Sequence, residues 1–227
     1  MQVSEMLARV AVKMQALPWK TVYVGGATTH LLVTDSTAPL VSPTVDVDVL
    51  VDIESPVEFQ VQLSQALRAL GAKEDTSEGA PLCRWIVGEV TVDVMSPNSS
   101  VLGFSNSWYP EVLAQCEEHQ LKGTSILLID ALSFLATKIE AFEGRGKGDF
   151  LASKDVEDII AVLDGRPELL EEMRERSPQL KEFIAEHLEQ WIANPDFEYA
   201  MQGYLQENVE RIPLLKNRIT QLIAAAR

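Results

Sequence analysis

Two aspartates placed two positions apart are the most chemically suggestive feature of this chain. Asp46 and Asp48 alternate with valines in the run TVDVDVL, residues 44–50. Because strand side chains alternate between two faces, both carboxylates are expected on one face. Their mutual repulsion is removed by a divalent cation, and Mg²⁺ prefers carboxylate oxygens and usually bridges to substrate phosphates as well. A solvent-facing edge strand shows the same alternation, so this motif alone leaves both interpretations open.

Two further stretches favour the metal-binding interpretation. Gly25 and Gly26 stand between the β-rich run TVYV and the helical pattern ATTHLLV. Glycines let a phosphate approach the backbone, and a helix N-terminus offers free N–H groups. Asp93 lies among valines in VTVDVMS, residues 90–96. If this strand neighbours the first, three carboxylates can hold two metal ions and promote displacement at phosphorus.

The elements that must position these residues alternate between strands and helices in the first half of the chain. A helix is expected over 4–16 with Ser4 as its N-cap, strands over 21–24, 45–51, 82–87 and 90–96, and helices over 27–33 and 57–70. Gly88-Glu89, between the last two strands, is typical of a two-residue hairpin. Beyond residue 120 the pattern is helical, with Ser153 as an N-cap and Pro178, Pro195 and Pro213 near helix starts or turns.

The whole chain therefore predicts an α+β protein: a mixed sheet with packed helices over 1–120, followed by a helical bundle over 121–227. The 227 residues suit one large domain or two small ones. Neither a signal peptide nor a membrane span is expected, and the two cysteines form no CxxC pair, so a cytoplasmic location is expected. The net charge of −15 argues against a broadly basic nucleic-acid-binding surface.

The order of these motifs resembles the nucleotidyltransferase superfamily with the DNA polymerase β-like fold. The downstream stretch ALSFLATKIEAFEGRGKGDFLASKDVEDIIAVL resembles the K-x-x-A…R…K-D…D segment of AbiEii-type, or MenT-like, nucleotidyltransferases, which are toxins of type IV toxin–antitoxin systems. The resemblance covers about residues 18–165. It implies that the C-terminal helices complete the active-site cleft.

The resemblance also implies roles for individual residues. Asp46, Asp48 and Asp93 would be catalytic metal ligands for Mg²⁺, with two ions expected, and Asp93 would alternatively act as a base. The residues that would bind the nucleoside triphosphate are Gly25, Gly26, Thr28, Lys138, Arg145 and Asp158, and Lys154-Asp155 matches the connecting stretch of the motif. The chain departs from its relatives at Ser42, where they commonly carry arginine, and at Gly-Gly, where many carry Gly-Ser.

The expected activity is Mg²⁺-dependent transfer of a nucleoside monophosphate from an NTP to an acceptor hydroxyl. RNA or tRNA, a protein and a small molecule stay open as acceptors, and an antitoxin protein is a candidate partner. Two other function classes stay open. One is a degenerate nucleotidyltransferase fold that binds a nucleotide or a partner without turnover, and the other is a helical interaction protein that binds no nucleotide.

Overall fold

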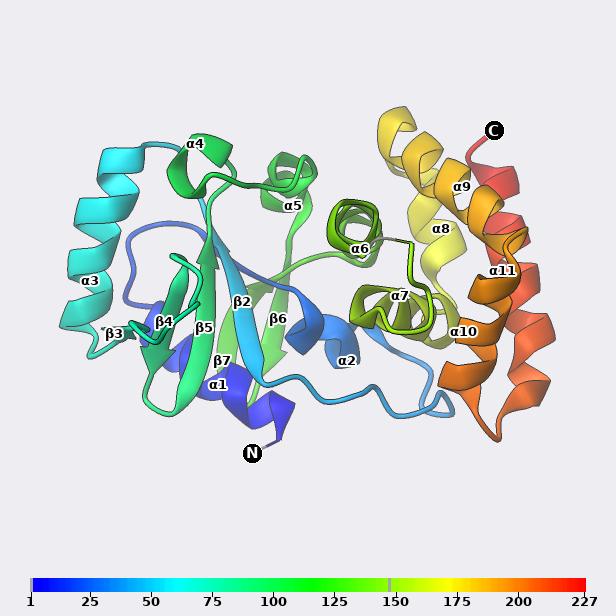
Figure 1. The fold of residues 1–227 in the computed structure, drawn as a ribbon, viewed down its shortest axis with the longest axis horizontal. Helices are drawn as coiled ribbons and strands as arrows, with labels where there is room; N and C mark the ends of the chain where they lie inside the picture. Colours follow the sequence, from blue (N-terminus) through cyan, green and yellow to red (C-terminus); the bar gives the residue numbers. More distant parts are fainter. Residues whose placement is uncertain (1, 147) are drawn as a thin grey trace. The chain divides into compact units, whose positions relative to one another are not determined.

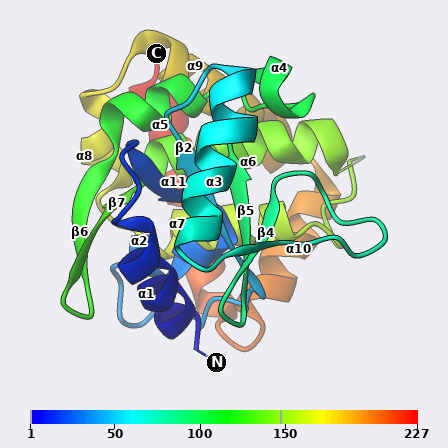
Figure 2. The same ribbon diagram turned by 90° about the vertical axis from the view of Figure 1, so that its left-hand side faces the viewer.

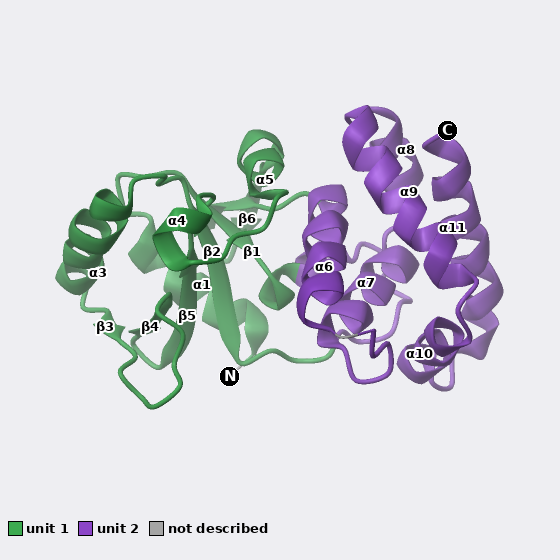
Figure 3. Cartoon of the chain, turned by 45° about the horizontal axis from the view of Figure 1, so that its top comes forward, with its two compact units in different colours: residues 1–28, 42–130 green, residues 29–41, 131–227 purple. Residues whose placement is uncertain are grey.

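The computed structural model describes residues 2–146 and 148–227, which divide into two compact units. Unit 1 comprises residues 1–28 and 42–130, and unit 2 comprises residues 29–41 and 131–227 (Figure 3). The sheet lies in unit 1 and is followed by helices, which confirms the predicted α+β class. No helix in the described residues combines the length and apolar character needed to cross a membrane.

Unit 1 is built on a seven-stranded mixed sheet in the order β3-β4-β5-β2-β1-β7-β6 (Figure 1). Its elements are α1 (Val3–Met14), β1 (Thr21–Val24), the 3₁₀ turn η1 (Gly26–Thr28), β2 (Asp46–Val51), the π-helical turn η2 (Glu58–Leu63), α3 (Ser64–Ala69), β3 (Lys73–Glu74), β4 (Arg84–Val87), β5 (Val90–Met95), α4 (Ser99–Leu102), α5 (Tyr109–Gln115), β6 (Glu117–Leu121) and β7 (Thr124–Leu128). Strand β2 runs antiparallel to β1 and parallel to β5, and α1 packs against β7, β2 and β5 (Figure 2).

Helix α1 buries one side of its amphipathic pattern, including Leu7, Val10 and Met14, in the core of unit 1. It begins at Val3, with Gln2 as the extended N-cap residue. The prediction of Ser4 as N-cap was therefore wrong, because Ser4 already lies inside the first helical turn. The predicted helix over 57–70 forms as η2 and α3, and Gly71 follows it with φ +81°.

The last two strands of unit 1 were not predicted from the sequence. Strands β6 and β7 pair antiparallel around Lys122 and Gly123, which both have positive φ as in a type I′ hairpin turn. Strand β6 has the sequence EEHQL and lies at the edge of the sheet, so it lacks the apolar run expected of a buried strand. These strands extend unit 1 to Asp130, beyond the boundary expected near residue 120.

Unit 2 consists of α2 (Thr29–Leu32), α6 (Ala131–Arg145), α7 (Lys154–Gly165), α8 (Leu169–Arg174), α9 (Pro178–Ile192), α10 (Pro195–Leu205), the 3₁₀ turn η3 (Val209–Arg211) and α11 (Ile212–Ala225). Helix α7 packs against α6, α10, α11 and α2, and α11 also packs along α8 and α9. The predicted cap at Ser153 is confirmed, since its hydroxyl accepts from the N–H of Val156. The three prolines lie in the first turns of α9, α10 and α11.

Residues 29–41 belong to unit 2 although they precede the second strand of the sheet. The N–H groups of Thr34 and Asp35 both donate to the carbonyl of Gly165, each at 2.9 Å. The guanidinium of Arg211 then joins Asp35, at 2.7 Å, to Asp164, at 2.8 Å. A hydrophobic pattern does not reveal such polar contacts between distant segments, so the assignment of this loop to the helical unit could not be predicted.

Candidate functional site in unit 1

Strand β2 presents the two aspartates as expected from its alternation. Val47 and Val49 are fully buried on one face, whereas Asp46 and Asp48 are half-buried on the other. Thr44 donates its hydroxyl to Oδ1 of Asp46 at 2.8 Å, which holds that carboxylate in place. The strand begins at Asp46, one residue later than predicted, and Val45 before it is 83% exposed.

The glycine turn after β1 meets this strand at Asp48. Val24, the last residue of β1, is the register partner of Asp48, and Gly25 follows with φ +69°. A Cβ atom added to Gly25 would lie only 1.9 Å from Oδ2 of Asp48. Glycine is therefore required twice here, for the left-handed backbone and for the space that the carboxylate occupies.

The residues after Gly25 close a single tight turn. Gly26 begins η1, and the hydroxyl and N–H of Thr28 both donate to the carbonyl of Gly25, at 2.8 and 3.1 Å. The side chain of Thr28 is fully buried. The hydroxyl of Thr28 stabilises the turn in this structure, and its contact with nucleotide phosphate stays a prediction.

Asp93 lies beside Asp48 on the neighbouring strand. The parallel register of β2 and β5 pairs Asp48 with Asp93, so both side chains lie on the same face of the sheet, as the three-carboxylate hypothesis requires. Asp93 is 7% exposed and receives a forked ion pair from Arg84, with Nε at 2.8 Å from Oδ1 and Nη2 at 2.7 Å from Oδ2. The same Nη2 lies 3.8 Å from Oδ2 of Asp46.

Arg84 is the residue that the sequence analysis missed at this site. The hairpin around Gly88-Glu89 pairs Val87 with Val90, and counting outward from that turn places Arg84 opposite Asp93. The pairing of Arg84 with Asp93 could therefore have been predicted from the sequence, once the two-residue turn was recognised. The carboxylates raise the pKa of the guanidinium, first through its hydrogen bonds with Asp93, so Arg84 carries a permanent positive charge.

The donor set at this face fits a hard divalent cation. Asp46 and Asp48 supply carboxylate oxygens on one face, and Gly25 leaves space for one of those oxygens. Mg²⁺ is usually held by one or two carboxylates, with water and substrate phosphates completing its shell. Within the described residues, no group of three or more His, Cys, Asp or Glu side chains is arranged to hold a metal ion. The pair on β2 thus fits Mg²⁺, whereas Asp93 is engaged by Arg84.

The downstream motif residues form a buried ion network in unit 2. The ammonium of Lys138, on α6, lies 3.0 Å from Asp155 and 2.7 Å from Asp158, both on α7. Arg145 binds Asp155 from the surface at 3.0 Å, and Lys154 lies 3.3 Å from the second oxygen of Asp158. Two carboxylates engage Lys138, so its side chain joins α6 to α7, and its contact with the triphosphate stays a prediction.

At the centre of this network, ion pairing has a larger effect than burial on the pKa values of the charged groups. Burial alone would lower the pKa of Lys138, yet Asp158 and Asp155 raise that pKa above its ordinary value. Burial alone would raise the pKa of Asp155, and Lys138 with Arg145 lowers it instead. Both groups are consequently charged at neutral pH.

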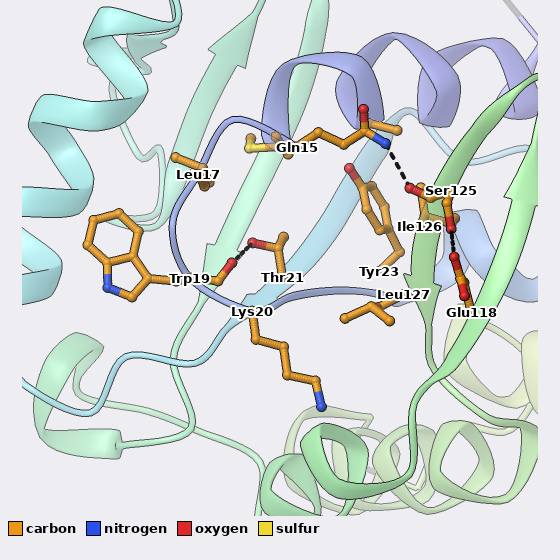
Figure 4. A pocket seen from close by; sticks show the side chains of 12 residues that line it. Gln15, Leu17, Trp19, Lys20, Thr21, Tyr23, Glu118, Ser125, Ile126 and Leu127 are labelled. Carbon is orange, nitrogen blue, oxygen red and sulfur yellow. Dashed lines mark hydrogen bonds between the residues drawn. The ribbon is translucent and has the colours of Figure 1, made fainter.

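A separate hollow of about 320 Å³ in unit 1 lies by the connection between α1 and β1 (Figure 4). Met14, Leu17 and Ile126 give it apolar walls, and Trp19 and Lys20 also line it. The buried hydroxyl of Tyr23, another lining residue, has no hydrogen-bond partner within the described residues. The hollow contains none of the predicted site residues.

Comparisons with known proteins identify the fold. The sequence matches no protein-family model and no curated protein. An antigenic nucleotidyltransferase-like protein from Paracoccidioides brasiliensis is structurally similar, with a TM-score of 0.52 and 18% identity over 97% of this chain and 93% of that one. The antibiotic-resistance factor ANT(2'')-Ia aligns with a TM-score of 0.51 and 11% identity over 84% of this chain and 93% of that one. The chain has the fold of nucleotidyltransferase-like proteins.

Proposed function

We propose that this protein is a Mg²⁺-dependent nucleotidyltransferase. It transfers a nucleoside monophosphate from an NTP to an acceptor hydroxyl and releases pyrophosphate. The observation that carries the proposal is the contact between the Gly25 turn and the Asp48 carboxylate, on a sheet with the nucleotidyltransferase-like fold. A glycine turn beside paired carboxylates brings a phosphate-accessible backbone next to metal-ligand oxygens.

In the proposed reaction the acceptor oxygen forms a bond to the α-phosphorus. The bond between that phosphorus and the oxygen that bridges the α- and β-phosphates breaks. The electron pair of the broken bond leaves with pyrophosphate, and the hydroxyl proton passes to a carboxylate, for which Asp93 is the candidate. Mg²⁺ on Asp46 and Asp48 would neutralise the phosphate charge. The protein contributes mainly positioning and fixed charge.

The finer assignments come from the family resemblance. It points to the AbiEii-type or MenT-like branch and a cytoplasmic toxin with an antitoxin partner, and it assigns nucleotide binding to Lys138, Arg145 and Asp158. Of these three, Arg145 has the side chain that is mostly exposed, so it is the one best able to meet a ligand without breaking the buried network. RNA or tRNA, protein and small-molecule acceptors all stay candidates. The net charge of −15 disfavours a long RNA contact.

A second candidate function is nucleotide binding without turnover. The forked ion pair between Arg84 and Asp93 favours it, because both oxygens of this carboxylate already accept hydrogen bonds from the guanidinium. Ser42, which stands where relatives carry arginine, points the same way.

Release of pyrophosphate from the four NTPs, with Mg²⁺ and with RNA, protein and aminoglycoside acceptors in turn, tests both functions. Wild type is expected to release pyrophosphate with one acceptor class, and Asp46→Asn and Asp48→Asn are expected to abolish the release. Equal rates in wild type and both variants would refute the active-site assignment. Mg²⁺-NTP binding without release under every condition would establish the second function.

A further inference from the structure

The charge at the carboxylate face depends on one residue with no role in the family motif. Arg84 reaches this face from β4, and its side chain is 28% exposed. It binds both oxygens of Asp93 and lies 3.8 Å from Asp46. A forked guanidinium–carboxylate pair is stronger and more directional than a single ion pair.

This pair has a physical reason to persist. The Asp93 side chain is only 9% exposed, and a buried carboxylate needs a positive partner. Burial and the charge of Asp93 raise the pKa of the neighbouring Cys83 thiol to about 11, so that thiol is neutral and adds no charge. Arg84 already engages both oxygens of Asp93 and lies 3.8 Å from Asp46, so a divalent cation at Asp93 would have to displace the guanidinium or meet its repulsion.

We propose that Arg84 takes the place of a second divalent cation, so that the site binds a single one through Asp46 and Asp48. Asp93 is then held by the guanidinium and is not a metal ligand. Arg84 is a positioning residue that fixes Asp93 and sets the number of ions. This inference rests on the proposed nucleotidyltransferase function and changes its metal requirement from two ions to one.

Titration of the whole chain with Mn²⁺ alone, followed by the EPR signal of the free ion, measures the number bound. One ion per wild-type chain is expected, and none in the Asp46→Asn/Asp48→Asn double variant. Arg84→Met removes the positive charge, so it is expected to bind a second ion or to bind the first about 10-fold more tightly. Arg84→Lys keeps the charge and is expected to bind one ion as wild type does.

Arg68→Met is the matched control for charge. It removes a guanidinium from an exposed pair with Glu74 in the same unit and is expected to leave Mn²⁺ binding unchanged. Circular dichroism establishes that each variant is folded. If Arg84→Met does not fold, the wild-type stoichiometry and the affinity of Arg84→Gln decide the question.

Two ions per wild-type chain, both lost on Asp93→Asn, would overturn the inference. So would unchanged stoichiometry and affinity in a folded Arg84→Met. If pyrophosphate release still depends on Asp46 and Asp48 in those cases, the proposed function stands and only the role of Arg84 fails. Absence of Mn²⁺ binding together with absence of pyrophosphate release would reject both.

Discussion

A Cβ atom on Gly25 would lie 1.9 Å from Oδ2 of Asp48, and this distance defines the relation between the glycine turn and the carboxylate strand. The two residues are 23 positions apart in sequence, and the β1–β2 register brings them together by pairing Val24 with Asp48. A side chain at residue 25 cannot be accommodated without moving either the turn or the carboxylate. The position of Asp48 therefore depends on the absence of a side chain at Gly25.

Gly25→Ala is accordingly expected to damage both stability and the site. The substitution forces alanine to φ +69° and places its Cβ against Asp48, so a loss of several kcal/mol in the free energy of unfolding is expected. Pyrophosphate release is expected to fall by about 100-fold, since a displacement near 1 Å has that effect on positioned groups. Urea unfolding and the pyrophosphate assay measure the two effects.

Gly71→Ala is the control that separates the effect of backbone strain from the effect of the steric clash with Asp48. Gly71 has φ +81°, and a Cβ there would have no neighbour within 4 Å. This control is expected to cost only about 1 kcal/mol and to leave pyrophosphate release unchanged. Equal losses of stability and activity in the two variants would show that the contact with Asp48 has no special importance.

The buried network of unit 2 predicts a large difference between two lysines. Lys138→Met leaves Asp155 and Asp158 without their shared buried partner, so a loss of about 3–5 kcal/mol in the free energy of unfolding is expected. Lys154→Met is the matched control, because Lys154 also pairs with Asp158 but has a side chain that is 41% exposed. It is expected to cost less than about 1 kcal/mol.

Urea unfolding of both lysine variants measures these losses, and the KM for NTP gives a second readout. If Lys138→Met unfolds like wild type yet raises the KM for NTP, the lysine serves the triphosphate and not the packing of α6 on α7.

Alternation and turn chemistry could be predicted wherever the relevant residues are close in sequence. The strands around Asp48 and Asp93, the hairpin at Gly88 and the cap at Ser153 all follow from patterns within ten residues. Polar contacts between distant segments could not be predicted in this way. The resemblance assigns Lys138 to the triphosphate, which stays a prediction, but no local pattern indicated that Asp155 and Asp158 from the next helix engage its ammonium.

The two cysteines are expected to differ sharply in reactivity. Cys83 is buried, and its environment raises the pKa of its thiol to about 11, whereas Cys116 is partly exposed. Because the thiolate is the reactive form, Cys83 is expected to resist a disulfide reagent at pH 8 while Cys116 reacts. One thiol per native chain and two in urea are the expected counts, and Cys116→Ser is expected to lower the native count to zero. Rapid reaction of both thiols in the native protein would contradict the burial of Cys83.

The decrease in the free energy of unfolding at low pH is expected to depend on Asp155. Lys138 and Arg145 hold the folded-state pKa of this carboxyl below its unfolded value of 3.8. A carboxyl with a lowered folded pKa stabilises the fold fully above the unfolded pKa, and that contribution is lost as the pH falls through the folded pKa. Asp155→Asn is therefore expected to be destabilised relative to wild type at pH 7, with the difference shrinking below pH 3.8. Urea unfolding of both proteins between pH 7 and pH 3 measures this difference.

Glu189→Gln is the control for this pH series, since Glu189 forms an exposed ion pair with Arg227. Exposed pairs contribute less than about 1 kcal/mol, so this variant is expected to follow wild type closely throughout the series. A constant gap between wild type and Asp155→Asn across the whole range would mean that the carboxyl acts through shape and hydrogen bonding alone. A gap that closes only on acidification identifies its charge as the stabilising feature, because protonation then makes the wild-type side chain as neutral as asparagine.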